Sequence, residues 1–162
     1  MDLSMAWIDR GEMQLGRPIG SVIVLSDAPT VARLKSGSEA WPDSIAFDDM
    51  ENKGYTLDKF RTPTFTYSTS GMNVSDNIHA LDSGDGIQRT ITCSNSFPDS
   101  YCRLISGKSI QKITETLYSI DDRSYYLMVD ATLKPTLRQT SSGQELIVKL
   151  SNAQPVTYSI IW

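Results

Sequence analysis

Histidine and cysteine are scarce in this chain, which limits the chemistry it can perform. There is one histidine, His79, and there are two cysteines among 162 residues. A zinc site takes four ligands of such types, so this set is too small. A catalytic triad would have to use His79, which we place in a strand between Ile78 and Ala80 as a half-exposed structural residue. The sequence therefore predicts no metal, no cofactor and no catalytic residue.

Long apolar runs and an excess of basic residues are also absent. No apolar run reaches the roughly 18 residues of a membrane-spanning helix, so we expect no transmembrane segment. The net charge is −4 and no basic face is visible, which argues against a nucleic-acid partner. The densest charged cluster is acidic and comprises Asp43, Asp48, Asp49 and Glu51. It is interpreted either as a solvated loop or as a patch that attracts a basic protein.

The two cysteines, Cys93 and Cys102, lack the CxxC spacing of redox motifs. Apolar, β-favouring residues flank them, and a polar turn with a proline lies between them. We therefore predict two strands joined by a loop that a Cys93–Cys102 disulfide closes, with Phe97 at its tip as a contact residue. A disulfide would place the protein in the periplasm or outside the cell. Because residues 1–10 do not resemble a signal peptide, an export signal or anchor would then have preceded the chain.

Short alternating segments separated by turn signals fill most of the chain. They predict one domain over 1–162 that is all-β, or β-rich α+β. The expected architecture is an antiparallel sandwich or barrel of about 8–10 short strands with at most one or two short helices. Residues 1–17 are expected to be flexible or docked. The clearest hairpin covers 74–81 and 87–93, where Arg89 interrupts an apolar face.

Three further segments test the strand prediction. Residues 21–25 and 30–34 are predicted to form a hairpin. Residues 110–120 combine helical apolar spacing with β-branched residues, and we favour strand–turn–strand. Residues 125–133 alternate, which places Tyr125, Leu127 and Val129 on one face. Tyr126 and Met128 then form an apolar patch on the outer face, either as an interface or beneath another layer.

One tripeptide resembles a catalytic motif but also fits an ordinary turn. Asp82-Ser83-Gly84 matches the core of aspartic peptidases, in which two aspartates share a proton. No second copy occurs, so a homodimer would be required, and we interpret the tripeptide as a hairpin turn.

The leading hypothesis is a non-enzymatic, exported protein-binding domain that neutralises a basic partner, as immunity or inhibitor proteins do. The alternatives are a dimeric aspartic peptidase using Asp82 and a β-barrel carrier of a small apolar ligand.

Overall fold

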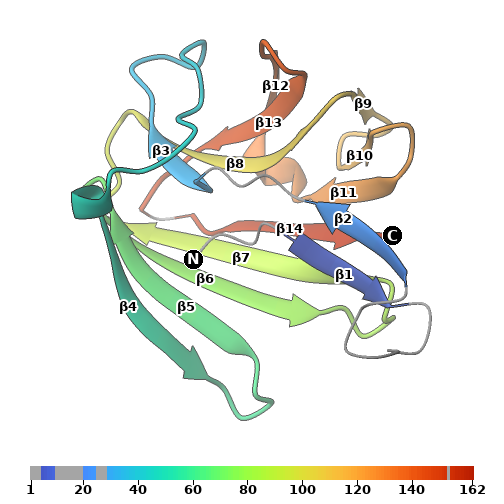
Figure 1. Ribbon diagram of the computed structural model, residues 1–162, viewed down its shortest axis with the longest axis horizontal. Helices are drawn as coiled ribbons and strands as arrows, with labels where there is room; N and C mark the ends of the chain where they lie inside the picture. Colours follow the sequence, from blue (N-terminus) through green and yellow to red (C-terminus); the bar gives the residue numbers. More distant parts are fainter. Residues whose placement is uncertain (1–4, 10–19, 25–28, 153) are drawn as a thin grey trace.

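The computed structural model describes residues 5–9, 20–24, 29–152 and 154–162. Two open antiparallel sheets face each other, as Figure 1 shows, and confirm the predicted β-sandwich rather than a barrel. Along the larger sheet the strands are β4 (Met50–Leu57), β5 (Pro63–Thr69), β6 (Met72–Ala80), β7 (Gly86–Ser94), β14 (Val156–Ile161), β11 (Tyr125–Val129), β10 (Leu117–Ile120) and β9 (Ile110–Lys112). The smaller sheet contains β12 (Thr136–Gln139), β13 (Gln144–Lys149), β8 (Ser100–Gly107) and β3 (Val31–Arg33).

Four short elements complete the described chain. Strands β1 (Met5–Asp9) and β2 (Gly20–Val24) pair with each other as a separate hairpin. Two 3₁₀ turns, η1 (Phe47–Asp49) and η2 (Ala131–Leu133), lie next to strands. Of the predicted N-terminal segment, residues 1–4 and 10–17 lie outside the described residues.

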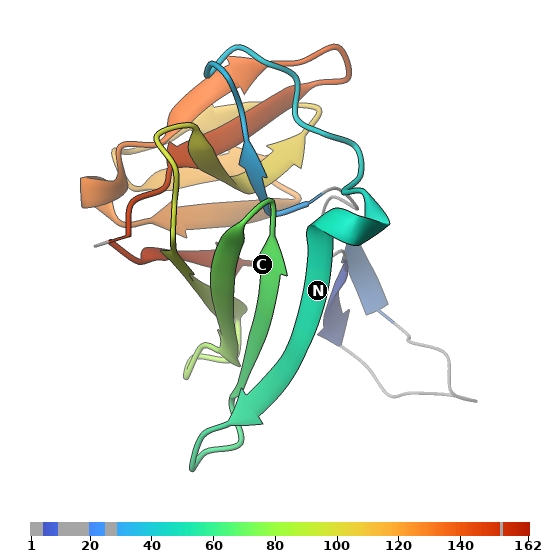
Figure 2. The same cartoon turned by 90° about the vertical axis from the view of Figure 1, so that its left-hand side faces the viewer.

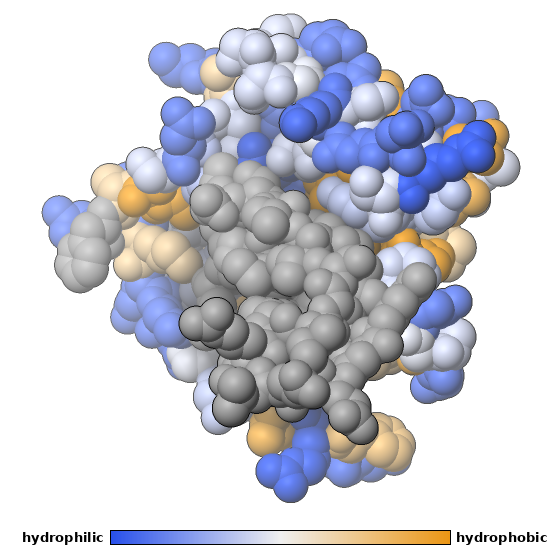
Figure 3. Space-filling view, turned by 45° about the vertical axis from the view of Figure 1, so that its right-hand side comes forward, coloured by the Kyte–Doolittle hydropathy of each residue, from blue (hydrophilic) through white to orange (hydrophobic). Residues whose placement is uncertain are grey.

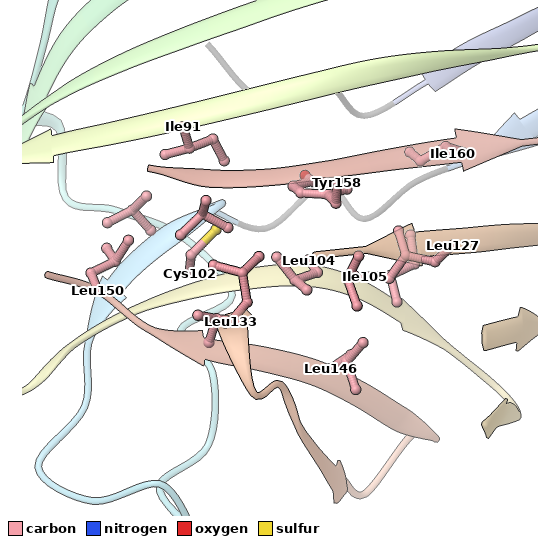
Figure 4. Packing of buried hydrophobic residues seen from close by; sticks show 14 of the residues in the cluster. Ile91, Cys102, Leu104, Ile105, Leu127, Leu133, Leu146, Leu150, Tyr158 and Ile160 are labelled. Atoms are coloured by element: carbon pink, nitrogen blue, oxygen red, sulfur yellow. The ribbon is translucent and has the colours of Figure 1, made fainter. Parts of the chain in front are cut away.

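The core lies between the two sheets and follows the predicted alternation. In β11, Tyr125, Leu127 and Val129 are buried, whereas Met128 is exposed, which confirms the expected faces. Figure 4 shows apolar side chains of both sheets meeting in this layer, among them Leu127 and Ile160 from one sheet and Leu146 from the other. Such burial supplies the main driving force for a fold of this kind.

A buried ion pair interrupts this apolar layer. The side chains of Asp76 in β6 and Arg89 in β7 are 1% and 5% exposed. The Nε of Arg89 donates to Asp76 Oδ1 at 2.9 Å, and its other nitrogens donate to the hydroxyls of Tyr158 (3.2 Å) and Thr30 (3.0 Å). Every nitrogen of the guanidinium thus donates a hydrogen bond, which is the condition under which a buried charge is tolerated. Arg89 is therefore a core residue, although it breaks the apolar pattern.

The hairpin predicted for residues 21–25 and 30–34 is wrong. β2 pairs with β1, and β3 pairs with β8 of the smaller sheet instead. Both segments are β-formers, but an apolar run does not specify its partner strand. The turn expected between them falls mostly on residues 25–28, which lie outside the described residues.

Other strand predictions have mixed outcomes. The hairpin of β6 and β7 is confirmed, and so is the strand–turn–strand interpretation of residues 110–120, now β9 and β10. Ile45 and Phe47 predict a short strand at 44–47, but the chain enters η1 there instead. The stretch 134–144 is polar and contains Pro135 and Gly143, so no strand is predicted in it, yet it includes β12.

The predicted disulfide is also wrong, because both cysteines are free and buried. β7 and β8 do not form a hairpin. They belong to different sheets, and Cys93 faces Val74 while Cys102 lies between Val31 and Val148. Figure 4 shows Cys102 in the layer between the sheets. Burial raises the pKa of the Cys102 thiol to about 12. The argument for an oxidising compartment therefore loses its support.

One part of the larger sheet extends beyond the smaller sheet. We call residues 50–69, which form β4, the turn after it and β5, the arm. Figures 1 and 2 show the arm curving away from the body of the sandwich, with β4 as the edge strand. At the end near the body Tyr67 and Thr69 are buried, whereas residues 51–61 are exposed.

Candidate functional site

The arm exposes large apolar side chains that a monomeric domain normally buries. Every residue from Glu51 to Arg61 is exposed. The exposed fractions of Tyr55, Leu57 and Phe60 are 64%, 49% and 75%. Figure 3 shows hydrophobic and hydrophilic side chains side by side at the lower, projecting end of the molecule. Aromatic residues clustered on an exposed surface are typical of interaction sites.

The turn at the tip of the arm is built from its own residues. Asp58 Oδ1 accepts hydrogen bonds from the backbone amides of Phe60 (2.9 Å) and Thr62 (2.8 Å). The amide of Arg61 donates to the carbonyl of Asp58 at 2.9 Å, with Arg61 at φ 65°. The Lys59 ammonium lies 4.8 Å from the centre of the Phe60 ring. The tip therefore presents one aromatic ring together with two basic side chains.

The opposite end of the arm is acidic. Asp48 and Asp49 are exposed in η1, and Glu51 is exposed at the start of β4, where its carboxylate accepts a hydrogen bond from Ser68 Oγ at 3.3 Å. The carbonyl of Asp49 accepts a hydrogen bond from the amide of Ser70 at 3.1 Å, which ties η1 to the turn after β5. We call this end of the arm, together with the adjoining η1, the base. Three of the four predicted acidic residues are thus brought together, whereas Asp43 lines a cleft elsewhere.

Between base and tip, the arm carries a bulge and an aromatic pair. The pairing of β4 with β5 shifts between Asn52 and Tyr55, with Gly54 at φ 94°. The Tyr55 and Phe65 rings lie 5.9 Å apart at 48°. Pairing places both rings on the face that also carries Asp76, which is the inner face of the sheet. The apolar side chains of the arm therefore point to the side that the smaller sheet covers elsewhere.

The other predicted contact residues are less accessible. Tyr126 is half-buried beside Ile161, and Met128 is 43% exposed on the same outer face. Phe97 does not project from its loop but packs against the core, with the Arg33 guanidinium 4.1 Å from its ring centre. A Cβ on Gly71 would lie 3.4 Å from the same ring. The packing of Phe97 therefore anchors the loop to the core.

A cleft of ≈ 950 Å³ lies beside the smaller sheet and contains a second charged cluster. Arg138 donates to Glu145 Oε1 at 3.1 Å and to the carbonyls of Gly37 (2.8 Å) and Glu39 (2.6 Å). The Arg103 guanidinium lies 5.1 Å from the ring centre of Trp41. These contacts fasten the loop before η1 to β8, β12 and β13, and we assign the cluster a structural role.

The remaining motifs have ordinary structural settings. Asp82 is exposed in the turn between β6 and β7, where the amide of Leu81 donates to the carbonyl of Gly86 at 2.9 Å. His79 is half-buried at a position that pairs with Gln88. The interior between the sheets is filled by side chains, which gives no support to the carrier alternative.

Metal ligands, membrane-spanning helices and known relatives provide no assignment of function. Within the described residues, no group of three or more His, Cys, Asp or Glu gathers as a metal site. The same part of the chain contains no helix that is long and apolar enough to cross a membrane. No family model, curated protein or solved structure matches this chain. Function must therefore be argued from geometry.

Sequence reasoning overlooked the apolar residues of the arm. Tyr55 and Leu57 alternate within a stretch that is otherwise charged and polar, and Phe60 follows in the turn. That alternation indicates a strand with one apolar face. This alternation is visible in the sequence, but it predicts that the apolar face of the strand is buried. Only the position of β4 at the edge of the sheet shows that these side chains are exposed.

Proposed function

We propose that the protein is a non-enzymatic protein-binding domain that contacts its partner through the arm. The observation that carries this proposal is the exposure of Tyr55, Leu57 and Phe60 on a projecting hairpin. Full burial of a Phe or Leu side chain gains about 1.5–3 kcal/mol, so Phe60, Leu57 and the neighbouring Tyr55 would each gain stabilisation from a partner that covers them. Aromatic anchors of this kind carry much of the energy at protein interfaces.

The local rigidity of the tip supports the same proposal. Because Asp58 fixes the turn with two hydrogen bonds, Phe60 is held in place before any partner arrives. A preorganised contact loses less conformational entropy on binding than a flexible one. Neutralisation of a partner protein, the role expected from the sequence, is one use of such a surface.

Site-specific photo-crosslinking tests this function. A photoreactive phenylalanine analogue replaces Phe60, and irradiation is carried out in the cells that naturally make the protein. We expect a covalent adduct with a polypeptide, identified by mass spectrometry. The matched control carries the analogue at Thr92, which is exposed on β7 of the same sheet. Equal adducts at both positions, or none at position 60, would overturn the proposal.

A further inference from the structure

We infer that the partner of the arm is a second copy of this chain, with two arms packed antiparallel about a two-fold axis. This inference rests on the proposed function and names its partner. In a two-fold interface each surface meets itself, so the arm has to be complementary to its own reverse. The order of charged and apolar side chains along the arm meets that condition.

Charge is the first half of this complementarity. Asp48 and Asp49 lie at the base, and Lys59 and Arg61 lie at the tip. Two further charged residues lie toward the outer face and take no part in packing of the inner faces. They are Glu51, which pairs opposite Ser68, and Lys53, whose Nζ donates to Asn73 Oδ1 at 2.9 Å. The one acidic group at the tip, Asp58, is engaged by the backbone amides of its own turn. Among the described residues, no salt bridge involves Asp48, Asp49, Lys59 or Arg61. Antiparallel packing places the basic tip of each arm against the acidic base of the other.

The apolar middle is the second half. Tyr55 and Leu57 occupy the inner face of β4 between the two charged ends, with Phe65 beside Tyr55 on β5. An arm read from base to tip is acidic, apolar and basic, and its partner read in the opposite direction is basic, apolar and acidic. Both apolar stretches therefore meet when both pairs of charged ends meet. The eight residues of β4 span about 25 Å, which separates the two ends well beyond the Debye length of about 8 Å at physiological salt.

The same charge order disfavours the partner expected from the sequence. A uniformly basic protein would be attracted by Asp48 and Asp49 but repelled by Lys59 and Arg61 at the other end. A partner with both signs, separated as they are on the arm, fits better. A second copy has this arrangement by construction.

Sedimentation velocity on the purified chain, over a range of concentrations, tests the inference. We expect a concentration-dependent monomer–dimer equilibrium that weakens at least tenfold in Phe60→Ser. Two charge variants, Lys59→Glu with Arg61→Glu and Asp48→Lys with Asp49→Lys, should each sediment as monomers. Their equimolar mixture should recover the dimer, because each tip then meets a base of opposite sign.

The control variant matches the tip variant in charge and backbone. Arg123→Glu with Lys149→Glu makes the same charge change at exposed sites outside the arm, and Arg123 (φ 67°) has the conformation of Arg61 (φ 65°). It should dimerise like the wild type. A wild-type chain that stays monomeric overturns the second-copy assignment, whereas adducts at position 60 with a different polypeptide would preserve the proposed function. A mixture that stays monomeric while the wild type dimerises overturns the antiparallel arrangement.

Discussion

Strands β7 and β4 belong to the same sheet but occupy different environments. β7 is covered by the smaller sheet, so that even its charged residue, Arg89, is buried and fully paired. Beyond Met50, which packs against the core, β4 has no covering layer, and Tyr55 and Leu57 are exposed like its charged residues. The difference shows that residue type alone does not determine burial at either strand. Position relative to the second sheet decides it.

The largest effect is expected from breaking the buried pair. Arg89→Met leaves Asp76 as an uncompensated charge in the core, which should lower the free energy of unfolding by about 3–5 kcal/mol. The matched control is Arg33→Met, whose partner Asp99 forms an exposed ion pair at 2.9 Å. Loss of this exposed, solvent-screened pair should destabilise the protein far less than loss of the buried one.

Urea denaturation measures both variants. Adding Asp76→Leu to Arg89→Met should recover most of the loss, because the pair is then replaced by apolar groups. Equal destabilisation by the Arg33 and Arg89 variants would contradict the contrast between the exposed ion pair and the covered, buried one.

Leucine truncation compares the same two regions without charge. Leu127 is fully buried in β11, so Leu127→Ala should cost about 2–5 kcal/mol, from lost burial and the cavity left behind. Leu57 is 49% exposed in the arm, so Leu57→Ala should change stability by no more than about 0.5 kcal/mol. Thermal and urea unfolding of the monomeric protein give both values. A large cost for Leu57→Ala would mean that the arm is packed rather than free.

The buried thiols give the covered region a pH dependence. The pKa of Cys102 is raised to about 12 by burial, whereas the unfolded thiol titrates near its ordinary value. The unfolded chain therefore loses this proton first, and stability falls as pH rises above about 9, by about 1.4 kcal/mol per pH unit for this group. Cys102→Ala should flatten the slope between pH 9 and 10 in urea titrations. Native protein should also react slowly with thiol reagents at pH 8, and an unchanged slope would contradict this assignment.

The smallest effect is expected at the tip. Asp58→Ala removes the acceptor for two amides, but this turn is exposed and makes its own hydrogen bonds. Global stability should change by no more than about 0.5 kcal/mol. Hydrogen exchange at the amides of Phe60 and Thr62 should accelerate, because local opening becomes easier. Unchanged exchange would show that something other than Asp58 holds the turn.

The alternation of single strands was sufficient to predict the sandwich class and the buried face of β11. It could not specify strand partners, because pairing depends on the whole topology. For this reason β3 was assigned to the wrong neighbour, and the cysteines of β7 and β8 were expected to meet. Arg89 looked anomalous because its counter-ion, Asp76, lies on the neighbouring strand.

The candidate site was less predictable than the fold. The acidic residues at the base of the arm were identified from their density in the sequence. The apolar residues beyond them were overlooked, because a Tyr-x-Leu alternation indicates a buried strand unless the covering layer is known to be missing. Phe97 was misplaced for the converse reason, since a loop position does not reveal that Arg33 covers the ring.

The bulge in β4 has a consequence for aggregation. An exposed sheet edge can template the addition of further strands, which leads to open-ended polymers. β4 is a long edge strand, and its ladder is broken between Asn52 and Tyr55. The other edges of the two sheets of the sandwich, β9, β3 and β12, are only three or four residues long. Each edge of the sandwich is thus either interrupted or short, which disfavours the addition of further strands while the arm stays exposed.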